Sequence, residues 1–285
     1  MARKQYQSII RLMEHTGVDP NAPLNIQRLR KQLSAEFDFS ATGFIEVGGY
    51  SYNKADVFEE LDHPLFEQRL AYHLRIWNSA FILSLLENNE FNFTEFRDQL
   101  SSFNNDPAFD EFFSPWFSES FSQLSRTLLH ENSFQDMGHL LLFEEFIVGQ
   151  DREEAFRPLR IFLEENLKVF RNLNKENYTA FRPQLEKWLL PYWSDVFNNL
   201  PDEYFHYKHD HAYHLVNLTV AIQRSHPKDC VAISQELTCM KDLSSEMSAI
   251  ILGNHNAYTH KKESTVNWSW VIWIVIILLR VMSGC

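Results

Sequence analysis

The chain has 285 residues, of which 45% are hydrophobic and 22% are charged, and its formal net charge is −12. This composition indicates a folded protein with a sizeable core, because a disordered chain carries fewer apolar residues. The acidic balance argues against a nucleic acid partner and against broad adsorption to an anionic membrane surface. Three cysteines are too few for a disulfide framework, so we expect a reducing compartment.

The N-terminal part predicts two amphipathic helices, over residues 3–16 and 24–37. Gly17 is placed to end the first helix, because glycine adopts a positive φ at little cost. The start of the chain is basic but has no continuous apolar run, so we do not expect a secretory signal peptide.

A β-hairpin is expected next, over residues 43–47 and 50–53. The two glycines between these runs suit a two-residue hairpin turn. Asn53 is placed to cap the helix that follows. A lone hairpin is marginal in water, so helices should cover the face of this one that carries four large side chains. The pairs on that face are Ile45 with Tyr52 and Val47 with Tyr50.

From Pro64 onward the pattern is helical. Residues 64–85 predict one central helix that is apolar on two sides. Asn78 lies beside an apolar stripe of this helix, where a buried amide would set the helix register or line a site. Residues 91–121 hold nine phenylalanines. They predict core-forming short helices, with breaks at residues 104–107 and 114–115; the alternative is a groove for a partner helix.

The second half of the body predicts further helices. An apolar helix over residues 134–148 should end at Gly149, and Asp151 with Glu154 has the spacing of a capping box. The segment Ala-Phe-Arg-Pro occurs at residues 155–158 and again at residues 180–183. Such a repeat favours stacked helical units of the bundle or short solenoid type.

No local motif for catalysis or for a cofactor is present, so the sequence predicts neither. The one candidate site is a stripe on a helix expected over residues 202–224. Its Glu-x-x-His spacing resembles that of di-iron bundles, and its ligand types suit zinc, iron or manganese. The apolar residues of this helix lie on its other side, so a solvated, pH-sensitive face is the favoured interpretation. The four candidate metal ligands are Glu203, His206, Asp210 and His214.

The C-terminal end is the most apolar part of the chain. Residues 254–263 predict a polar linker, and residues 264–285 predict a single-pass transmembrane anchor. Indole rings suit the headgroup level of a bilayer, and a guanidinium near the far end can reach the opposite interface. The alternative is an apolar helix that docks on the core of the protein. The anchor residues are Trp268, Trp270, Trp273, Ile274, Ile277, Leu278 and Arg280.

Together these patterns predict a mainly α fold: a helical bundle or short array with one N-terminal β-hairpin and a C-terminal transmembrane helix. The expected parts are residues 1–62, a helical domain over 63–253, the linker and the anchor. The leading functional hypothesis is a non-enzymatic, tail-anchored protein that binds another protein at a membrane, with its body on the cytoplasmic side. The alternatives are a helical metalloprotein that uses the 203–214 stripe, or a membrane-bound enzyme without a local motif.

Overall fold

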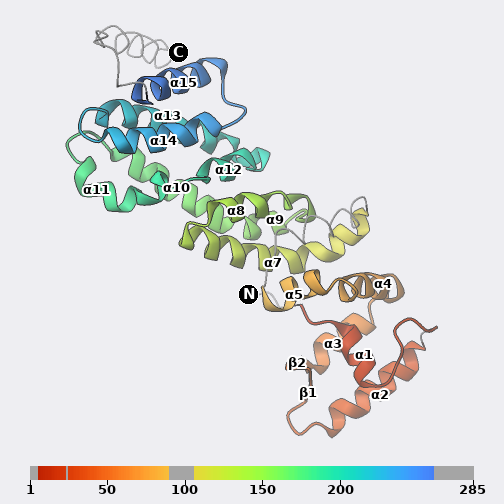
Figure 1. The fold of residues 1–285 in the computed structure, drawn as a ribbon. Coiled ribbons are helices and arrows are strands. Elements are labelled where there is room, and N and C mark those ends of the chain that lie inside the picture. The colour runs from red at the N-terminus through yellow and green to blue at the C-terminus, as the bar shows by residue number, and fades with distance from the viewer. Residues whose placement is uncertain (1–5, 24, 90–105, 260–285) are drawn as a thin grey trace. The chain divides into compact units, whose positions relative to one another are not determined.

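The computed structural model describes residues 6–23, 25–89 and 106–259 (Figure 1). These residues are mainly helical and form one two-stranded antiparallel sheet near the N-terminus, which confirms the predicted mainly α class with an N-terminal hairpin. The chain divides into two compact units. Unit 1 comprises residues up to 124 together with 145–157, and unit 2 comprises residues 125–144 and those from 158 onward. The core around the hairpin continues past residue 62, since Phe66 and Leu70 belong to the same cluster as Ile45 and Tyr52.

Unit 1 places a hairpin among short helices. Gly17 ends the first helix with φ of +72°, as its position in the sequence predicts. The elements of this unit are α1 (Ile9–His15), α2 (Ile26–Phe39), β1 (Phe44–Val47), β2 (Tyr50–Asn53), α3 (Lys54–Leu61), α4 (Phe66–Trp77), α5 (Ala80–Asn88), the first part of α7 (Pro107–Glu131), η1 (Glu144–Phe146) and α9 (Asp151–Ala155).

The hairpin has the predicted register. Ile45 pairs with Tyr52, and Val47 pairs with Tyr50. Ile45 and Tyr52 are buried, while the other pair is half-buried and packs against the same core. Both turn glycines have positive φ, which glycine tolerates because it has no Cβ. The side chain of Asn53 accepts a hydrogen bond from the backbone N–H of Asp56 at 2.8 Å, so the predicted cap of α3 is also confirmed.

The predicted central helix over residues 64–85 is wrong, because the structure divides it into α4 and α5. Asn78 ends α4 and is exposed, so no buried amide sets the helix register there. Ser79 begins α5, where its hydroxyl accepts a hydrogen bond from the N–H of Ile82 at 3.3 Å. A serine side chain that bonds to the backbone in this way favours a helix start over a continuous helix.

The predicted break at residues 114–115 is also wrong, since α7 continues through Pro115. Proline within a helix costs about 3 kcal/mol because it removes a donor and crowds the preceding turn. The rings of Phe113 and Phe117, one on each side of this proline, are fully buried and stack at 5.1 Å. Their burial offsets that cost. The other expected break, at residues 104–107, lies partly outside the described residues.

Asp151, the predicted start of a capping box, lies inside α9, and the residue at the N-cap is Gln150. Asp151 is the first residue of α9 and is buried. Its carboxylate accepts a hydrogen bond from the hydroxyl of Ser114 at 2.8 Å, and the same hydroxyl accepts one from the N–H of Val148 at 2.9 Å. This carboxylate therefore fixes the loop against α7 within unit 1.

Unit 2 is helical throughout its described part. The repeated Ala-Phe-Arg-Pro segment does not mark a structural repeat. Its first copy spans the end of one helix and the start of the next, while its second copy lies inside a single helix. The elements are the last part of α7, α8 (Phe134–Leu141), α10 (Arg157–Asn172), α11 (Tyr178–Leu185), η2 (Glu186–Leu189), α12 (Trp193–Asn198), η3 (Asp202–Tyr204), α13 (Phe205–Ile222), α14 (Pro227–Cys239) and α15 (Ser245–Thr259).

The structure describes only part of the segment for which a linker and an anchor are predicted. Residues 254–259 of the expected linker are the last turns of α15. The expected anchor, residues 264–285, lies outside the described residues. Within the three described ranges, no helix combines the length and the apolar content that crossing a bilayer requires.

Candidate functional site

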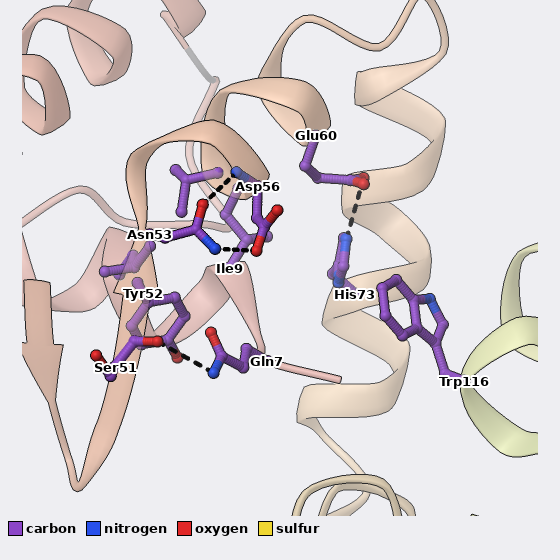
Figure 2. A pocket seen from close by; sticks show the side chains of 11 residues that line it. Gln7, Ile9, Ser51, Tyr52, Asn53, Asp56, Glu60, His73 and Trp116 are labelled. Atoms are coloured by element: carbon purple, nitrogen blue, oxygen red, sulfur yellow. Dashed lines mark hydrogen bonds and ion pairs between the residues drawn. The ribbon is translucent and has the colours of Figure 1, made fainter. Parts of the chain in front are cut away.

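The candidate site is a polar pocket within unit 1, with a volume of about 220 Å³ (Figure 2). Residues far apart in the sequence form its walls. They come from the segment before α1 and from α1 itself, from β2, α3 and α4, and from α7. The lining residues are Gln7, Ile9, Leu12, Ser51, Tyr52, Asn53, Asp56, Val57, Glu60, His73 and Trp116.

The start of α3 supplies one side of this pocket. Asn53 caps the helix with its side-chain oxygen, and its amide nitrogen donates to the carboxylate of Asp56. A carboxylate in the first turn of a helix is stabilised by the exposed N–H groups and by the helix dipole. Gln7 donates a hydrogen bond to the backbone oxygen of Ser51 at 3.2 Å, which joins the segment before α1 to the hairpin.

A chain of hydrogen bonds forms the opposite side. His73, on α4, bonds through Nδ1 to the hydroxyl of Tyr6 at 2.8 Å and through Nε2 to Oε1 of Glu60, on α3, at 3.2 Å. Arg69 donates two further hydrogen bonds, one to each oxygen of Glu60, both at 2.7 Å. The pairing holds α3 against α4 one turn before His73.

The protonation states follow from these partners. Burial raises the pKa of the Glu60 carboxyl, but the hydrogen bonds from His73 and Arg69, together with the positive charge of Arg69, outweigh burial and lower it to about 2. Burial lowers the pKa of His73 by more than Glu60 raises it. At neutral pH Glu60 is therefore ionised and His73 is neutral. The consistent tautomer donates from Nε2 to Glu60 and accepts at Nδ1 from the Tyr6 hydroxyl.

This arrangement gives a fixed polar wall. Both ring nitrogens of His73 already have partners, so neither is placed to take a proton from a substrate. Burial also raises the pKa of Tyr6, which keeps its hydroxyl protonated as a donor. Groups that are held in this way can recognise a ligand without rearranging.

A second cavity of about 390 Å³ adjoins the first along α3. The two share Asp56, Glu60 and Trp116. Figure 2 shows Trp116 pointing from α7 toward His73. Its indole and the ring of Tyr6 pack edge to face, with centroids 5.7 Å apart. Trp116 is half-buried and forms a wall of both cavities. The residues that the second cavity adds are Glu59, His63, Arg69 and Pro115.

The metal-ligand stripe predicted in unit 2 is not assembled into a ligand set. Glu203 lies in η3 and is exposed, as is His206 at the start of α13. Asp210 forms an ion pair with Arg171 at 3.6 Å. Burial lowers the pKa of His214, and the positive charge of Arg171 lowers it further. Among the described residues, no three His, Cys, Asp or Glu side chains are grouped so that they could hold a metal ion.

The buried face of α13 carries two polar residues that the sequence reading did not single out. Lys208 and His211 are fully buried. They fall at helical spacing with the apolar positions 212, 215 and 222, and this spacing is the signal that could have found them. His211 donates from Nδ1 to the backbone oxygen of Tyr207 at 2.7 Å, and burial lowers its pKa to about 3.

No protein-family model matches the chain, and neither a curated protein nor a solved structure is similar enough to count as a match. The function must therefore be argued from the pocket and the sequence.

Proposed function

We propose that this chain is a tail-anchored interaction protein, whose helical body binds another protein beside a membrane. The observation that carries the binding role is the wall formed by His73 and Glu60, with Tyr6 hydrogen-bonded to His73 behind it. Its polar atoms are paired with one another, its charges are fixed, and it borders cavities that an aromatic side chain also lines. Such a wall suits recognition of a partner better than proton transfer.

The membrane role is supported by the sequence alone. The run over residues 268–282 contains a single charged residue, Arg280, and three tryptophans near its start. As a helix, the 18 residues from 268 to 285 would reach about 27 Å, close to the thickness of a bilayer core. The body is acidic, so its attachment would rest on apolar burial rather than on charge. The proposal places that body on the cytoplasmic side.

Membrane sedimentation tests the anchor. The full chain should pellet with membranes and resist alkaline carbonate, because salt and pH do not screen apolar burial. Ile274→Asp with Ile277→Asp should release it, since each carboxylate near the bilayer centre costs about 2.5–3.5 kcal/mol. Asn256→Asp with Thr259→Asp adds the same charge to exposed positions of α15 and should leave the chain in the pellet. A full chain that stays in the supernatant would refute the anchor.

Site-specific photocrosslinking tests the binding role. A photoreactive residue at Glu59, an exposed position on the second cavity, should capture one defined protein from intact membranes. The same residue at Glu14, an exposed position of α1 that lines neither cavity, is the matched control and should not capture it. Equal capture at both positions would argue against the pocket as the binding surface.

The metalloprotein hypothesis stays a separate prediction. Metal content of the purified chain distinguishes it: stoichiometric zinc or iron that is lost in His206→Ala with His214→Ala would favour it over the interaction protein.

A further inference from the structure

A stripe of exposed side chains runs along α2, at the periphery of unit 1 (Figure 1). The opposite face of this helix is buried and packs into the core around the hairpin. At 100° per residue, the members of the stripe fall within an arc of about 80°. They are Arg28, Lys31, Ala35 and Phe39, and each is exposed, so the whole stripe is open to solvent.

The N-terminal half of the stripe carries two positive charges that are not neutralised. Within the described ranges of the chain, neither Arg28 nor Lys31 forms an ion pair, whereas the neighbouring Arg30 is paired with Asp62. The first turn of α2 contains Arg28 and no carboxylate. The positive end of the helix dipole lies at the same turn, so the dipole and the two side chains together favour an anionic partner.

The C-terminal half of the stripe ends in an aromatic ring. Phe39 is 90% exposed, the highest value among the large apolar side chains that the structure describes. A phenyl ring in this position is stabilised when an apolar side chain covers it and removes it from water. Arg28 and Phe39 lie about 16 Å apart along the helix axis, which is the length of three helical turns.

Charge complementarity selects one occupant for this surface. An acidic, amphipathic helix of another protein supplies carboxylates for the two cations and an apolar side chain for the ring within three turns. An anionic membrane or a nucleic acid would also meet the rest of an acidic chain, whose formal net charge is −12, and would be repelled by it.

We infer that the stripe on α2 binds an acidic, amphipathic helix of a protein partner. Carboxylates of that helix pair with Arg28 and Lys31, and one of its apolar side chains packs on Phe39. The inference goes beyond the proposed function, because the stripe lines neither cavity of unit 1. The ion pairs are exposed, so binding should weaken as the salt concentration rises.

The test is fluorescence anisotropy with the full chain in micelles of an uncharged detergent. The probe is a fluorescein-labelled, alanine-based peptide of about 16 residues, long enough to form a helix, with glutamate and leucine repeated on one face. It should bind saturably. The matched peptide with glutamine in place of glutamate has nearly the same shape but no negative charge, and it should bind at least about tenfold more weakly.

Two sets of variants locate the binding surface. Arg28→Gln with Lys31→Gln should weaken the glutamate peptide about tenfold, because both ion pairs are lost. Phe39→Ala should weaken it by a similar factor, because the apolar contact is lost. All three positions are exposed, so the fold should tolerate the changes, and an unchanged urea midpoint shows that each variant is folded.

Matched controls place the same changes elsewhere on the surface. Lys175→Gln with Lys228→Gln removes two charges from exposed positions of unit 2. Leu65→Ala removes an apolar side chain that is exposed in unit 1. Both variants should bind the glutamate peptide as tightly as the wild type does. Equal weakening in the controls and in the stripe variants would overturn the inference.

Three further results would overturn it. The first is equal binding of the glutamate and glutamine peptides. The second is displacement of the glutamate peptide by glycerophosphoserine at constant ionic strength, which would assign the stripe to a lipid headgroup. The third is self-association of the full chain that Arg28→Gln with Lys31→Gln abolishes, which would assign the stripe to a second copy. Capture at Glu59 involves a different surface, so the proposed function and this inference can fail separately.

Discussion

Arg11 and Glu87 form a buried, bidentate ion pair that joins α1 to α5 within unit 1. The two guanidinium nitrogens lie 2.7 and 2.6 Å from the two carboxylate oxygens, and the side chains are only 14% and 2% exposed. Arg11 also donates to the hydroxyl of Tyr52 at 3.1 Å, and that hydroxyl donates to the backbone oxygen of Ser8 at 3.1 Å. The pair therefore connects the hairpin to both helices.

Removing one member of this pair should be costly. Glu87→Gln leaves the largely buried Arg11 charge without its carboxylate partner, and such a loss costs about 3–5 kcal/mol. We expect a correspondingly lower free energy of unfolding in urea, followed by circular dichroism. The exposed pair of Lys54 and Asp38, with N···O at 2.7 Å, is the control: Asp38→Asn should cost less than 1 kcal/mol.

Replacing both members tests the reason for that cost. Arg11→Met with Glu87→Leu removes the guanidinium charge together with its carboxylate partner. Most of the stability lost in Glu87→Gln should therefore return. A double variant that is as unstable as Glu87→Gln would mean that the contacts of Arg11 with Tyr52 and Tyr50, and not the ion pair, carry the effect.

Acid should destabilise unit 2 through His211. Its ring is fully buried, its Nε2 has no hydrogen-bond partner, and it packs against Phe197 with ring centres 4.9 Å apart. Burial holds its folded pKa at about 3, below the ~6.5 of the unfolded chain. The unfolded state therefore binds more protons, and stability falls as pH drops from 6.5 toward 3, by roughly 4 kcal/mol in all.

His211→Phe should remove this part of the acid sensitivity, because a phenyl ring fits an aromatic site and does not titrate. The measurement is the urea midpoint at several pH values between 7 and 4. His206→Phe changes an exposed histidine of the same helix and should keep the wild-type dependence. If the slope with pH is the same in His211→Phe as in wild type, other groups cause the acid sensitivity.

Local signals in the sequence were sufficient for the hairpin and for its cap. The glycine pair fixes the turn, alternation fixes the face of Ile45 and Tyr52, and Asn53 has the side chain that a helix start requires. These features depend on neighbours within a few residues. The same holds for Gly17, whose positive φ ends α1.

The predictions of local structure failed where contacts between distant residues determine the backbone conformation. Pro115 predicts a helix break from propensity alone, yet burial of its phenylalanine neighbours keeps α7 continuous. Asp151 has the spacing of a capping box, but it lies inside α9, and its carboxylate accepts a hydrogen bond from Ser114, 37 residues earlier. No window of a few residues contains that information.

The pocket could not be predicted from the sequence for the same reason, because its residues are far apart in the chain. His73 meets Tyr6 across 67 residues and Glu60 across 13 residues, and Trp116 comes from a third segment. Histidine and glutamate at such separations have no fixed spacing that a motif could capture. The stripe at 203–214 was conspicuous because helical spacing is local, and the structure does not group it as ligands.

Gly138 should not tolerate a side chain. A Cβ at this position of α8 would lie 2.8 Å from Cβ and 3.0 Å from the backbone carbon of Asp195, on α12. Alanine favours a helix over glycine by about 1 kcal/mol, but this overlap forces two packed helices apart and costs about 1–3 kcal/mol. We expect Gly138→Ala to lower the urea midpoint.

Gly253→Ala is the matched control for that change. Gly253 lies within α15, and a Cβ there would meet no atom within 4 Å. Only the higher helix propensity of alanine then changes the stability, so this variant should raise the free energy of unfolding by up to about 1 kcal/mol. A gain in both variants would show that α8 and α12 pack less closely than the structure has them.

The buried amine of Lys208 should make the fold less stable than an uncharged side chain of the same length would. The side chain is 2% exposed, its Nζ has no hydrogen-bond partner, and the nearest carboxylate, that of Asp242, is 3.7 Å away and largely exposed. Burial lowers the pKa of this amine more than Asp242 raises it. Lys208→Met keeps the length of the side chain and removes the charge, so it should raise the free energy of unfolding at pH 7, by about 1–4 kcal/mol.

The gain from Lys208→Met should depend on pH in one direction. The unfolded amine has a pKa near 10.4, above that of the folded chain, so the unfolded state binds the proton more tightly. Wild-type stability therefore rises with pH through that window, and the advantage of methionine shrinks as pH approaches 10. Lys228→Met, an exposed position of α14, should have no such dependence. A loss of stability in Lys208→Met at pH 7 would mean that the amine makes a favourable contact that outweighs its burial.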